Sequence, residues 1–378
     1  MDKEIRKVDD VRDDITKIDY EIAELFEKRM GFAAELALSK KQAGESIYNK
    51  NKEDEKLSDI TKNRSNPFVI KGLEEVFIQM MSISRKYQYH MVHQRDRYIE
   101  NYFTEVPELV MFPDTRIVYP GVPGSFSEMA CEKFFGADVD HYAVVNFKDV
   151  AMALNNGDAD YGVLPIENSS AGDVTGVYDI LLENDVCMVG EVFVKVEHCL
   201  LGCPGSKIED LEVVLSHPQG LMQCAPYLEN LDVKKVSVEN TAIAAERVAR
   251  EKIMTQGAIA SRRAAELYGL DILDAGINFD KNNVTRFVIL SKKRQYTENA
   301  NKISISFSLL HESGTNILSH FLYNDLNLSH IESVPLPDQQ WEYRFYIDIN
   351  GNLHDPAVKN ALQGVRTEVA DFKILGNY

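Results

Sequence analysis

Residues 8–37 read VDDVRDDITKIDYEIAELFEKRMGFAAELA, and this stretch decides the fold of the N-terminal part of the chain. Its apolar residues recur at spacings of three and four, with Gly31 as the one glycine and no proline. Such spacing is typical of a helix with one apolar face. The pattern predicts a single helix of about 35 residues, and Ala43-Gly44 supplies the residue that ends it.

Two shorter helices are predicted to follow, one over residues 51–63 and one that opens at Asn66-Pro67, with proline in its first turn. The apolar residues of the third helix are Leu73, Val76, Phe77, Met80 and Met81. One long helix with two shorter ones cannot cover its own apolar stripe, so we expect an intertwined dimer. The expected all-α domain spans residues 1–92.

The periodicity changes after a polar connector at residues 93–113. Short apolar runs then alternate with helical stretches, which predicts an α/β domain over residues 114–293. Residues 300–378 follow the order strand, helix, strand, strand, helix, strand, which is ferredoxin-like. The fold class is therefore multidomain: an all-α segment, an α/β segment and an α+β segment.

Composition excludes several classes of function. The chain has 378 residues, with 41 Lys and Arg against 59 Asp and Glu, and this net charge of −18 disfavours general binding of nucleic acid or anionic membranes. It has no apolar run of the ~18 residues that a membrane span needs. Five cysteines are too few for a disulfide scaffold, so we expect a reduced, cytoplasmic protein. No cofactor motif occurs, and His198-Cys199 with Cys203 reads as a buried strand rather than a metal site.

Four strands of the α/β segment run into polar residues that are typical of helix starts. These residues are Gly124-Ser125, Asn168-Ser169, Ser216-His217-Pro218-Gln219 and Asn240-Thr241. Helix N-termini after strand ends offer free N–H groups, which commonly bind a carboxylate or phosphate. Four such junctions predict a cleft for a small anion between two lobes of the periplasmic-binding-protein kind.

Cations on the long helix are candidate ligands for a dianion. Arg29 and Lys40 are 11 residues apart, so they fall within ~20° of one stripe, about 16 Å apart along the helix axis. Arg12 lies ~100° away from that stripe and would serve the pocket of a partner chain. Spacing alone favours solvated charges. On the third helix, the inward-facing apolar stripe continues onto the polar residues Ser84 and Gln88. Either these side chains bind a ligand, or the stripe ends there because the helix frays.

Together these residues resemble the all-helical chorismate mutases. The match covers residues 1–92, including Tyr48-Asn49-x-x-Lys52-Glu53 and Ser84-Arg-Lys-x-Gln88. The resemblance implies rearrangement of chorismate to prephenate without a cofactor. It assigns Arg29 and the partner's Arg12 to the carboxylates, Lys40 and Gln88 to the ether oxygen, Glu53 to a hydroxyl and Ser84 to the carboxylate side. Asn49 and Lys52 stand where the family usually has Asp and Arg, and Lys cannot pair bidentately with a carboxylate.

The segment Thr285-Arg286-Phe287, taken with the four junctions in their order, resembles prephenate dehydratase. That family expels the ring hydroxyl and carboxylate of prephenate to give phenylpyruvate, water and CO₂. The resemblance makes Thr285 the proton donor or orienter. Residues implied to bind the substrate are Ser125, Asn168, Ser169, Ser216, Gln219, Thr241, Arg286 and Phe287. Periodicity alone makes Thr285 an exposed residue at the start of a strand.

The C-terminal segment resembles an ACT domain, which binds phenylalanine between subunits. Asn327-Leu328-x-x-Ile331 through Pro335 carries the match. The implied phenylalanine-binding residues are Gly314, Thr315, Asn316, Asn327, Glu332 and Ser333. Val334 replaces the family's Arg, and Thr315-Asn316 replaces its Ala-Leu.

Three interpretations are open. The first is a bifunctional chorismate mutase/prephenate dehydratase that forms a homodimer or homotetramer and is inhibited by phenylalanine. The second is a dehydratase whose helical domain serves mainly in dimerisation, which Asn49 and Lys52 favour. The third is a non-catalytic sensor of aromatic or amino acids. Arogenate is a further candidate substrate for the dehydratase.

Overall fold

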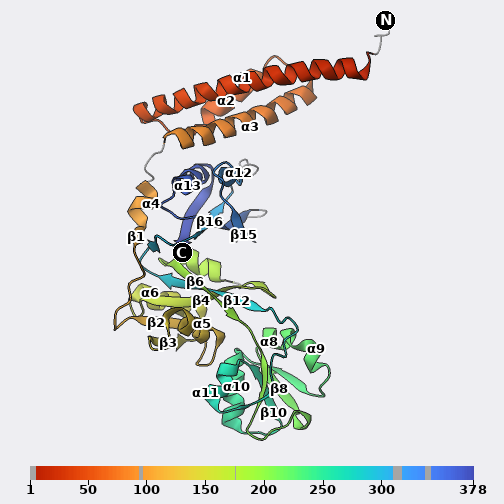
Figure 1. Ribbon diagram of the computed structural model, residues 1–378, viewed down its shortest axis with the longest axis vertical. Coiled ribbons are helices and arrows are strands. Elements are labelled where there is room, and N and C mark those ends of the chain that lie inside the picture. Colours follow the sequence, from red (N-terminus) through yellow and green to blue (C-terminus); the bar gives the residue numbers. More distant parts are fainter. Residues whose placement is uncertain (1–5, 93–96, 175, 310–316, 337–341) are drawn as a thin grey trace. The chain divides into compact units, whose positions relative to one another are not determined.

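The computed structural model describes residues 6–92, 97–174, 176–309, 317–336 and 342–378 (Figure 1). Contacts divide the chain into two compact units. The first unit contains Met1–Asn101 and Ile305–Phe372, and the second contains Tyr102–Ser304 with Lys373–Tyr378. The multidomain character expected from the sequence is confirmed, with a helical segment, an α/β segment and a C-terminal mixed segment.

The N-terminal segment forms the predicted helices α1 (Val8–Ala43), α2 (Lys50–Thr61) and α3 (Pro67–Val92). Gly44 ends α1 at a φ of 68°, and its N–H donates to the carbonyl oxygens of Lys40 and Lys41. This left-handed conformation costs glycine little. Asn49 caps α2 by accepting from the Lys52 N–H. A small core that contains Ala37 and Tyr89 joins α1 to α3.

The N-terminal half of α1 leaves its apolar stripe exposed. Val8 is 64% exposed, Ile15 53% and Leu25 66%. The other exposed apolar side chains of this half are Val11, Ile18, Tyr20 and Ile22. An apolar stripe of this length marks an interaction surface.

The C-terminal segment has the predicted strand order. Its sheet runs β15-β16-β14-β17, which is the ferredoxin-like arrangement. The elements of this segment are β14 (Lys302–Ser308), α12 (Ser319–Leu322), β15 (Leu328–Pro335), β16 (Tyr343–Asn350), α13 (Pro356–Glu368) and β17 (Ala370–Asn377). A further short helix, α4 (Arg97–Tyr102), follows the three N-terminal helices in the sequence. Helix α12 is short, and Asp325, three residues after its end, takes a φ of 53° that a helix cannot continue through.

The second unit has two lobes, each built on a sheet (Figure 1). The first sheet has the order β6-β12-β4-β2-β3, with β5 beside β4. Its strands are β2 (Arg116–Pro120), β3 (Asp140–Val144), β4 (Tyr161–Asn168), β5 (Gly172–Asp173), β6 (Cys187–Lys195) and β12 (Val284–Ser291). Its helices are α5 (Phe126–Phe135), α6 (Phe147–Asn156) and α7 (Val177–Glu183). This arrangement confirms the predicted α/β segment.

The second sheet has the order β11-β7-β10-β8-β9. Its strands are β7 (Cys199–Gly202), β8 (Val213–Ser216), β9 (Lys234–Ser237), β10 (Gln256–Ala260) and β11 (Asp271–Asp274). Helices α8 (Pro218–Gln223), α9 (Ala225–Leu228), α10 (Thr241–Glu251) and α11 (Arg262–Tyr268) surround it, and β1 (Thr104–Val106) pairs with β13 (Gln295–Thr297) elsewhere in the unit. Strand β7 is buried throughout, as expected for His198-Cys199, and the five cysteines are free and buried.

Three of the four predicted helix starts are confirmed. Ser125 caps α5, His217 caps α8 and Asn240 caps α10, each by accepting from a backbone N–H two or three residues on. The fourth prediction is wrong. Asn168 remains in β4, because it pairs with Thr285 of β12 on one side and with Gly172 of β5 on the other.

None of the helices that the structure describes combines the length and the apolar character needed to cross a membrane.

Two candidate active sites

The helical candidate site collects residues from α1, α2 and α3. Arg29 of α1 donates to the Met80 carbonyl oxygen at 3.0 Å and to Ser84 Oγ. Lys40 Nζ donates to the Ile47 carbonyl oxygen at 2.5 Å. Burial lowers the pKa of both cations, and the nearby Glu53 carboxylate raises it in part. Both cations are thus partly buried and under the influence of the same Glu53 carboxylate, although spacing alone favoured solvated charges.

Gln88 adds an unsatisfied polar atom to this helical domain. Its side chain is 5% exposed, and its Oε1 has no hydrogen-bond partner among the described residues. A buried acceptor without a partner costs about 1–3 kcal/mol. An unpaired group of this kind on the inward face of α3 favours a ligand over helix fraying, because α3 continues to Val92.

Three predicted mutase residues lie outside this cluster. Arg12 is exposed and pairs with Asp9 at 3.4 Å. The Lys52 side chain is 69% exposed and lies 3.8 Å from Glu45 Oε2. The Asn49 side chain is occupied by capping α2. Capping explains how Asn replaces Asp here without loss of the helix start.

The sequence analysis assigned no role to Arg85, yet it lies beside the site. Its side chain is buried, with Nη1 at 2.5 Å from Glu53 Oε2 and Nε at 2.9 Å from Glu368 Oε1. The guanidinium also stacks over the Tyr48 ring at 4.9 Å. The neighbouring Ser84 was already a candidate site residue, but the spacing of residues along a helix does not show that an arginine beside it is buried.

Lys86 is a buried cation with a testable energetic cost. It is 5% exposed, donates to Ser82 Oγ at 2.8 Å and lies 5.1 Å from the Tyr323 ring centroid. Burial lowers its pKa to about 8.

We expect Lys86→Met to stabilise the protein at pH 7 by about 1–2 kcal/mol, since methionine removes a desolvated charge. Between pH 8 and 10.5 the unfolded chain binds this proton more than the folded one does, so the wild type gains stability as pH rises. The advantage of the variant should therefore shrink. The thermal unfolding midpoints of the wild type and the variant, measured at about pH 7 and pH 9.5, give this advantage. An equal difference between the two proteins at both pH values would contradict the lowered pKa of Lys86.

The dehydratase candidate site centres on Thr285. Asn168 Nδ2 donates to Thr285 Oγ1 at 2.8 Å and to Asn283 Oδ1 at 2.7 Å. Thr285 is only 9% exposed, so the expectation of an exposed residue is wrong. The reason is that β12 lies between β4 and β6, which flank Thr285 on both sides.

A line of hydrogen bonds extends from Thr285 into the second lobe. Gln223 Nε2 approaches Asn168 Oδ1 at 3.5 Å, and His198 Nε2 lies 2.9 Å from Gln223 Oε1. Burial lowers the pKa of His198, so this imidazole is neutral near pH 7. The sequence analysis missed Gln223, His198 and Asn283 as site residues. The helical spacing of four between Gln219 and Gln223 could have indicated Gln223.

Helix starts from the two lobes of this unit also meet one another. A Cβ placed on Gly121 would lie 3.0 Å from Asn240 Nδ2 and 3.4 Å from Ser125 Oγ. A Cβ on Gly220 would lie 2.7 Å from Ser216 Oγ and 3.3 Å from Thr241 Cγ2. The N-termini of α5 and α10 thus converge from different lobes, with α8 beside α10, and helix N-termini favour anions.

The remaining predicted residues hold the surroundings in place. Ser216 Oγ donates to the Ile259 carbonyl oxygen at 2.7 Å, and Ser169 Oγ accepts from the Val284 N–H at 2.9 Å. Gln219 donates its backbone N–H to His217 Nδ1 at 3.2 Å. Phe287 is buried in the core of the first lobe.

Arg286 does not join Thr285. Its guanidinium binds Glu191 at 2.7 Å and Tyr378 Oη at 2.7 Å, and it lies 3.5 Å from Glu167. Successive residues of a strand point to opposite faces, which separates Arg286 from Thr285. Its observed contacts are an ion-pair network within the second unit.

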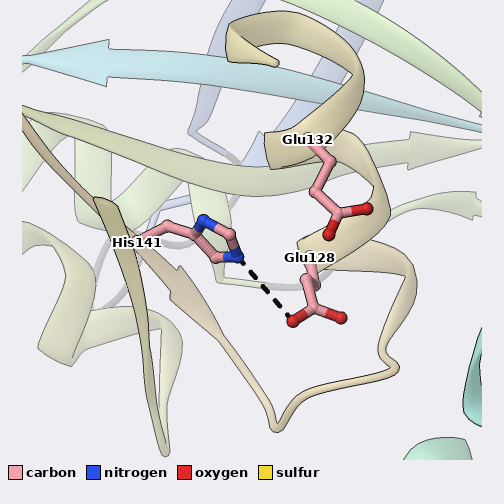
Figure 2. Close-up of side chains that lie close together, drawn as sticks. All are labelled: Glu128, Glu132 and His141. Atoms are coloured by element: carbon pink, nitrogen blue, oxygen red, sulfur yellow. Dashed lines mark ion pairs between the residues drawn. The ribbon is translucent and has the colours of Figure 1, made fainter. Parts of the chain in front are cut away.

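Figure 2 shows Glu128 and Glu132 of α5 beside His141 of β3. Glu128 Oε1 lies 3.8 Å from His141 Nε2 and accepts from Tyr119 Oη at 3.2 Å, while Oε2 accepts from the Gly124 N–H at 2.7 Å. Glu132 pairs with Arg263 at 3.2 Å. These contacts give Glu128 a role in holding the loop that carries Ser125.

The candidate phenylalanine residues Gly314, Thr315 and Asn316 lie outside the described residues. Asn327 precedes β15, and its carbonyl oxygen accepts from the Asn350 N–H at 2.8 Å. Glu332 and Ser333 lie in β15, opposite Tyr346 and Phe345 of β16.

Comparison with known proteins matches both segments that carry these candidate sites. The chorismate mutase type II family matches residues 11–89, and the prephenate dehydratase family matches residues 117–295. Arogenate dehydratase/prephenate dehydratase 6 of Arabidopsis thaliana is 38% identical over 283 residues, which cover 70% of this chain and 68% of that protein. The bifunctional chorismate mutase/prephenate dehydratase of Enterobacter agglomerans is 32% identical over 273 residues, 70% of either chain.

A solved structure extends this likeness. The Arthrobacter aurescens prephenate dehydratase, in complex with L-Phe, superposes with a TM-score of 0.65 at 27% identity, covering 70% of this chain and 89% of that one. Fold and sites thus define an enzyme of phenylalanine biosynthesis with two catalytic domains. The chain belongs to the prephenate dehydratase family, as a bifunctional member with a chorismate mutase domain before the dehydratase.

Proposed function

We propose that this chain rearranges chorismate to prephenate at the helical site and converts prephenate to phenylpyruvate at the Thr285 site. The observation that carries the proposal is the hydrogen bond from Asn168 Nδ2 to the buried Thr285 Oγ1. The helix N-termini that converge between the two lobes of the same unit support it. The partly buried Arg29, which donates to Ser84 Oγ, and the partly buried Lys40 support the mutase half.

In the mutase step, a C–C bond forms as the ether C–O bond breaks, and negative charge grows on the ether oxygen. Lys40 and Gln88 donate to that oxygen, since a preorganised donor in a desolvated site stabilises developing charge. Arg29, supported by Ser84, and Arg12 of the partner subunit bind the two carboxylates. Glu53 accepts from the substrate hydroxyl, and Asn49 caps the helix that carries Glu53.

In the dehydratase step, Thr285 protonates or orients the leaving hydroxyl. Its oxygen accepts from Asn168, so its own hydrogen is directed to the substrate. The hydroxyl leaves as water, the ring carboxylate leaves as CO₂, and the electrons of the broken C–C bond complete the aromatic ring. Ser125, Gln219 and Thr241 bind the dianion at the helix starts. Asn168 holds Thr285 and is itself contacted by Gln223, while Ser169 and Ser216 hold the neighbouring backbone.

The decisive experiment gives the purified full chain chorismate alone and follows chorismate loss and phenylpyruvate formation together. Both changes should occur. Persistence of chorismate, with conversion of added prephenate, would make the helical segment a dimerisation element, as Asn49 and Lys52 favour. Failure of both conversions would favour a sensor. Arogenate should be tested in parallel, because the Arabidopsis thaliana relative is named for both substrates.

The proposed regulator is L-phenylalanine, bound by the C-terminal domain through Gly314, Thr315, Asn316, Asn327, Glu332 and Ser333. Support comes from the ferredoxin-like order of its strands and from the L-Phe complex of the Arthrobacter aurescens enzyme. Calorimetry with millimolar L-phenylalanine tests it. Absence of binding heat would remove the proposal.

The proposed assembly is a homodimer or homotetramer in which a second copy covers the exposed apolar stripe of α1. Sedimentation of the full chain at micromolar concentration tests this, and a monomer would contradict it. The proposed domains are residues 1–92, 114–293 and 300–378, joined by the connector 93–113. The buried free cysteines support a reducing, cytoplasmic location.

A further inference from the structure

Arg85 connects two segments that are far apart in the sequence. It lies on α3, and its Nη1 binds Glu53 of α2 at 2.5 Å while its Nε binds Glu368 of α13 at 2.9 Å. Arg85 is 9% exposed and Glu368 is 7% exposed. Because the guanidinium is planar and presents its donors in fixed directions, the two carboxylates are held in a defined relation.

The bridge lies in a packed contact within the first unit. Helix α13 packs on α3, and Tyr89 Oη lies 2.9 Å from Thr367 Oγ1, one residue before Glu368. Tyr48 covers the guanidinium from the α2 side. Buried charge pairs of this kind are costly unless their geometry and hydrogen bonds are well satisfied, so they are sensitive to loss of one partner.

Glu368 also connects to the beginning of the C-terminal segment. Its Oε1 lies 3.2 Å from Nε2 of His320 on α12, a side chain that is 1% exposed. Burial alone would raise the pKa of Glu368, but His320 and Arg85 hold it below the usual value. His320 follows the proposed phenylalanine-binding residue Asn316 by four positions in the sequence.

Glu53 is the mutase residue that this bridge reaches. The pKa shifts of Arg29 and Lys40 both contain a contribution from its carboxylate. Arg85 binds Glu53 through Oε2, so loss of Arg85 would remove a contact that fixes the orientation of this carboxylate.

We propose that Arg85 is a positioning residue of the mutase, which orients Glu53 and transmits the state of the C-terminal domain to it through Glu368. The inference rests on the proposed mutase function of the helical site. It adds a direct route by which a ligand of the C-terminal domain alters chorismate turnover, separate from any effect on the dehydratase.

Glu368→Gln in the full chain tests the route. Glutamine keeps the size of the side chain and an oxygen that accepts from Arg85, but it removes the charge. Mutase kcat/KM should fall roughly tenfold, within the 5- to 150-fold typical of coupled sites, while turnover of added prephenate stays unchanged. Arg85→Lys should cause a similar loss, because one ammonium cannot reproduce the planar fork.

Asp371→Asn is the matched control. It removes the same charge three residues further on, where the carboxylate binds Arg344 at 3.3 Å, and its φ of 50° is one that asparagine tolerates. This variant should keep wild-type mutase kinetics. A double-mutant cycle distinguishes positioning of Glu53 from a merely structural role of Glu368. In a Glu53→Gln background, Glu368→Gln should cause no further loss of mutase kcat/KM.

Equal chorismate turnover by wild type and Glu368→Gln would overturn the inference and leave the proposed function intact. An equal loss in Asp371→Asn, or an additive loss in the Glu53→Gln background, would also overturn it. Failure of the wild type to convert chorismate would instead overturn the mutase function itself, so the two failures are distinguishable.

Discussion

Replacing Thr285 by valine should lower kcat for prephenate by about 10³-fold, while chorismate turnover by the same protein stays unchanged. Valine keeps the β-branched shape that suits the interior of β12 but removes the hydroxyl. The expected loss is that of a proton donor or orienter, typically 10²–10⁴-fold. Stopped assays of phenylpyruvate formation from prephenate and of chorismate loss measure the two activities separately.

Thr285→Ser is the matched control for this prediction. Serine keeps an oxygen that accepts from Asn168 Nδ2, so it should retain much more activity than valine. If Thr285→Val keeps more than a tenth of wild-type kcat, Thr285 is not the group that acts on the leaving hydroxyl. If the variant leaves every measured property unchanged, the sensor interpretation gains support.

Replacing Lys40 by methionine should lower mutase kcat by about 10²–10³-fold, the loss typical when one donor to a developing negative charge is removed. Lys40 is desolvated, which lowers its pKa and strengthens its interaction with an anion in the site. Prephenate turnover should not change, because Lys40 lies in the first unit and Thr285 in the second. Initial rates of chorismate loss at saturating substrate measure the effect.

Lys28→Met is the control, since Lys28 lies on the same helix and is exposed. It should leave both activities at the wild-type level. An equal loss in Lys28→Met and Lys40→Met would attribute the effect to the net charge of α1 rather than to a donor at the ether oxygen.

The sequence by itself determined the elements whose signals are local. The spacing of three and four in residues 8–37 predicted α1, and Asn66-Pro67 predicted the start of α3. The order of the C-terminal strands was predicted in the same way. Periodicity and capping depend on residues that are close in the sequence, so they can be recognised without knowledge of the tertiary structure. The family resemblance extended this to candidate site residues such as Thr285 and Arg29.

Only the tertiary structure decided which partners these residues have. Asn168 was predicted at a helix start but remains in a strand, because Thr285 pairs with it from 117 residues away. Arg85 and Glu368 meet across 283 residues of sequence. Such pairings depend on how strands and helices pack, and the free energy of a buried charge or amide depends on those distant partners. The local sequence pattern carries no information about these distant partners. Only the fold therefore showed that Arg286 faces Glu191 and that Arg85 connects Glu53 to Glu368.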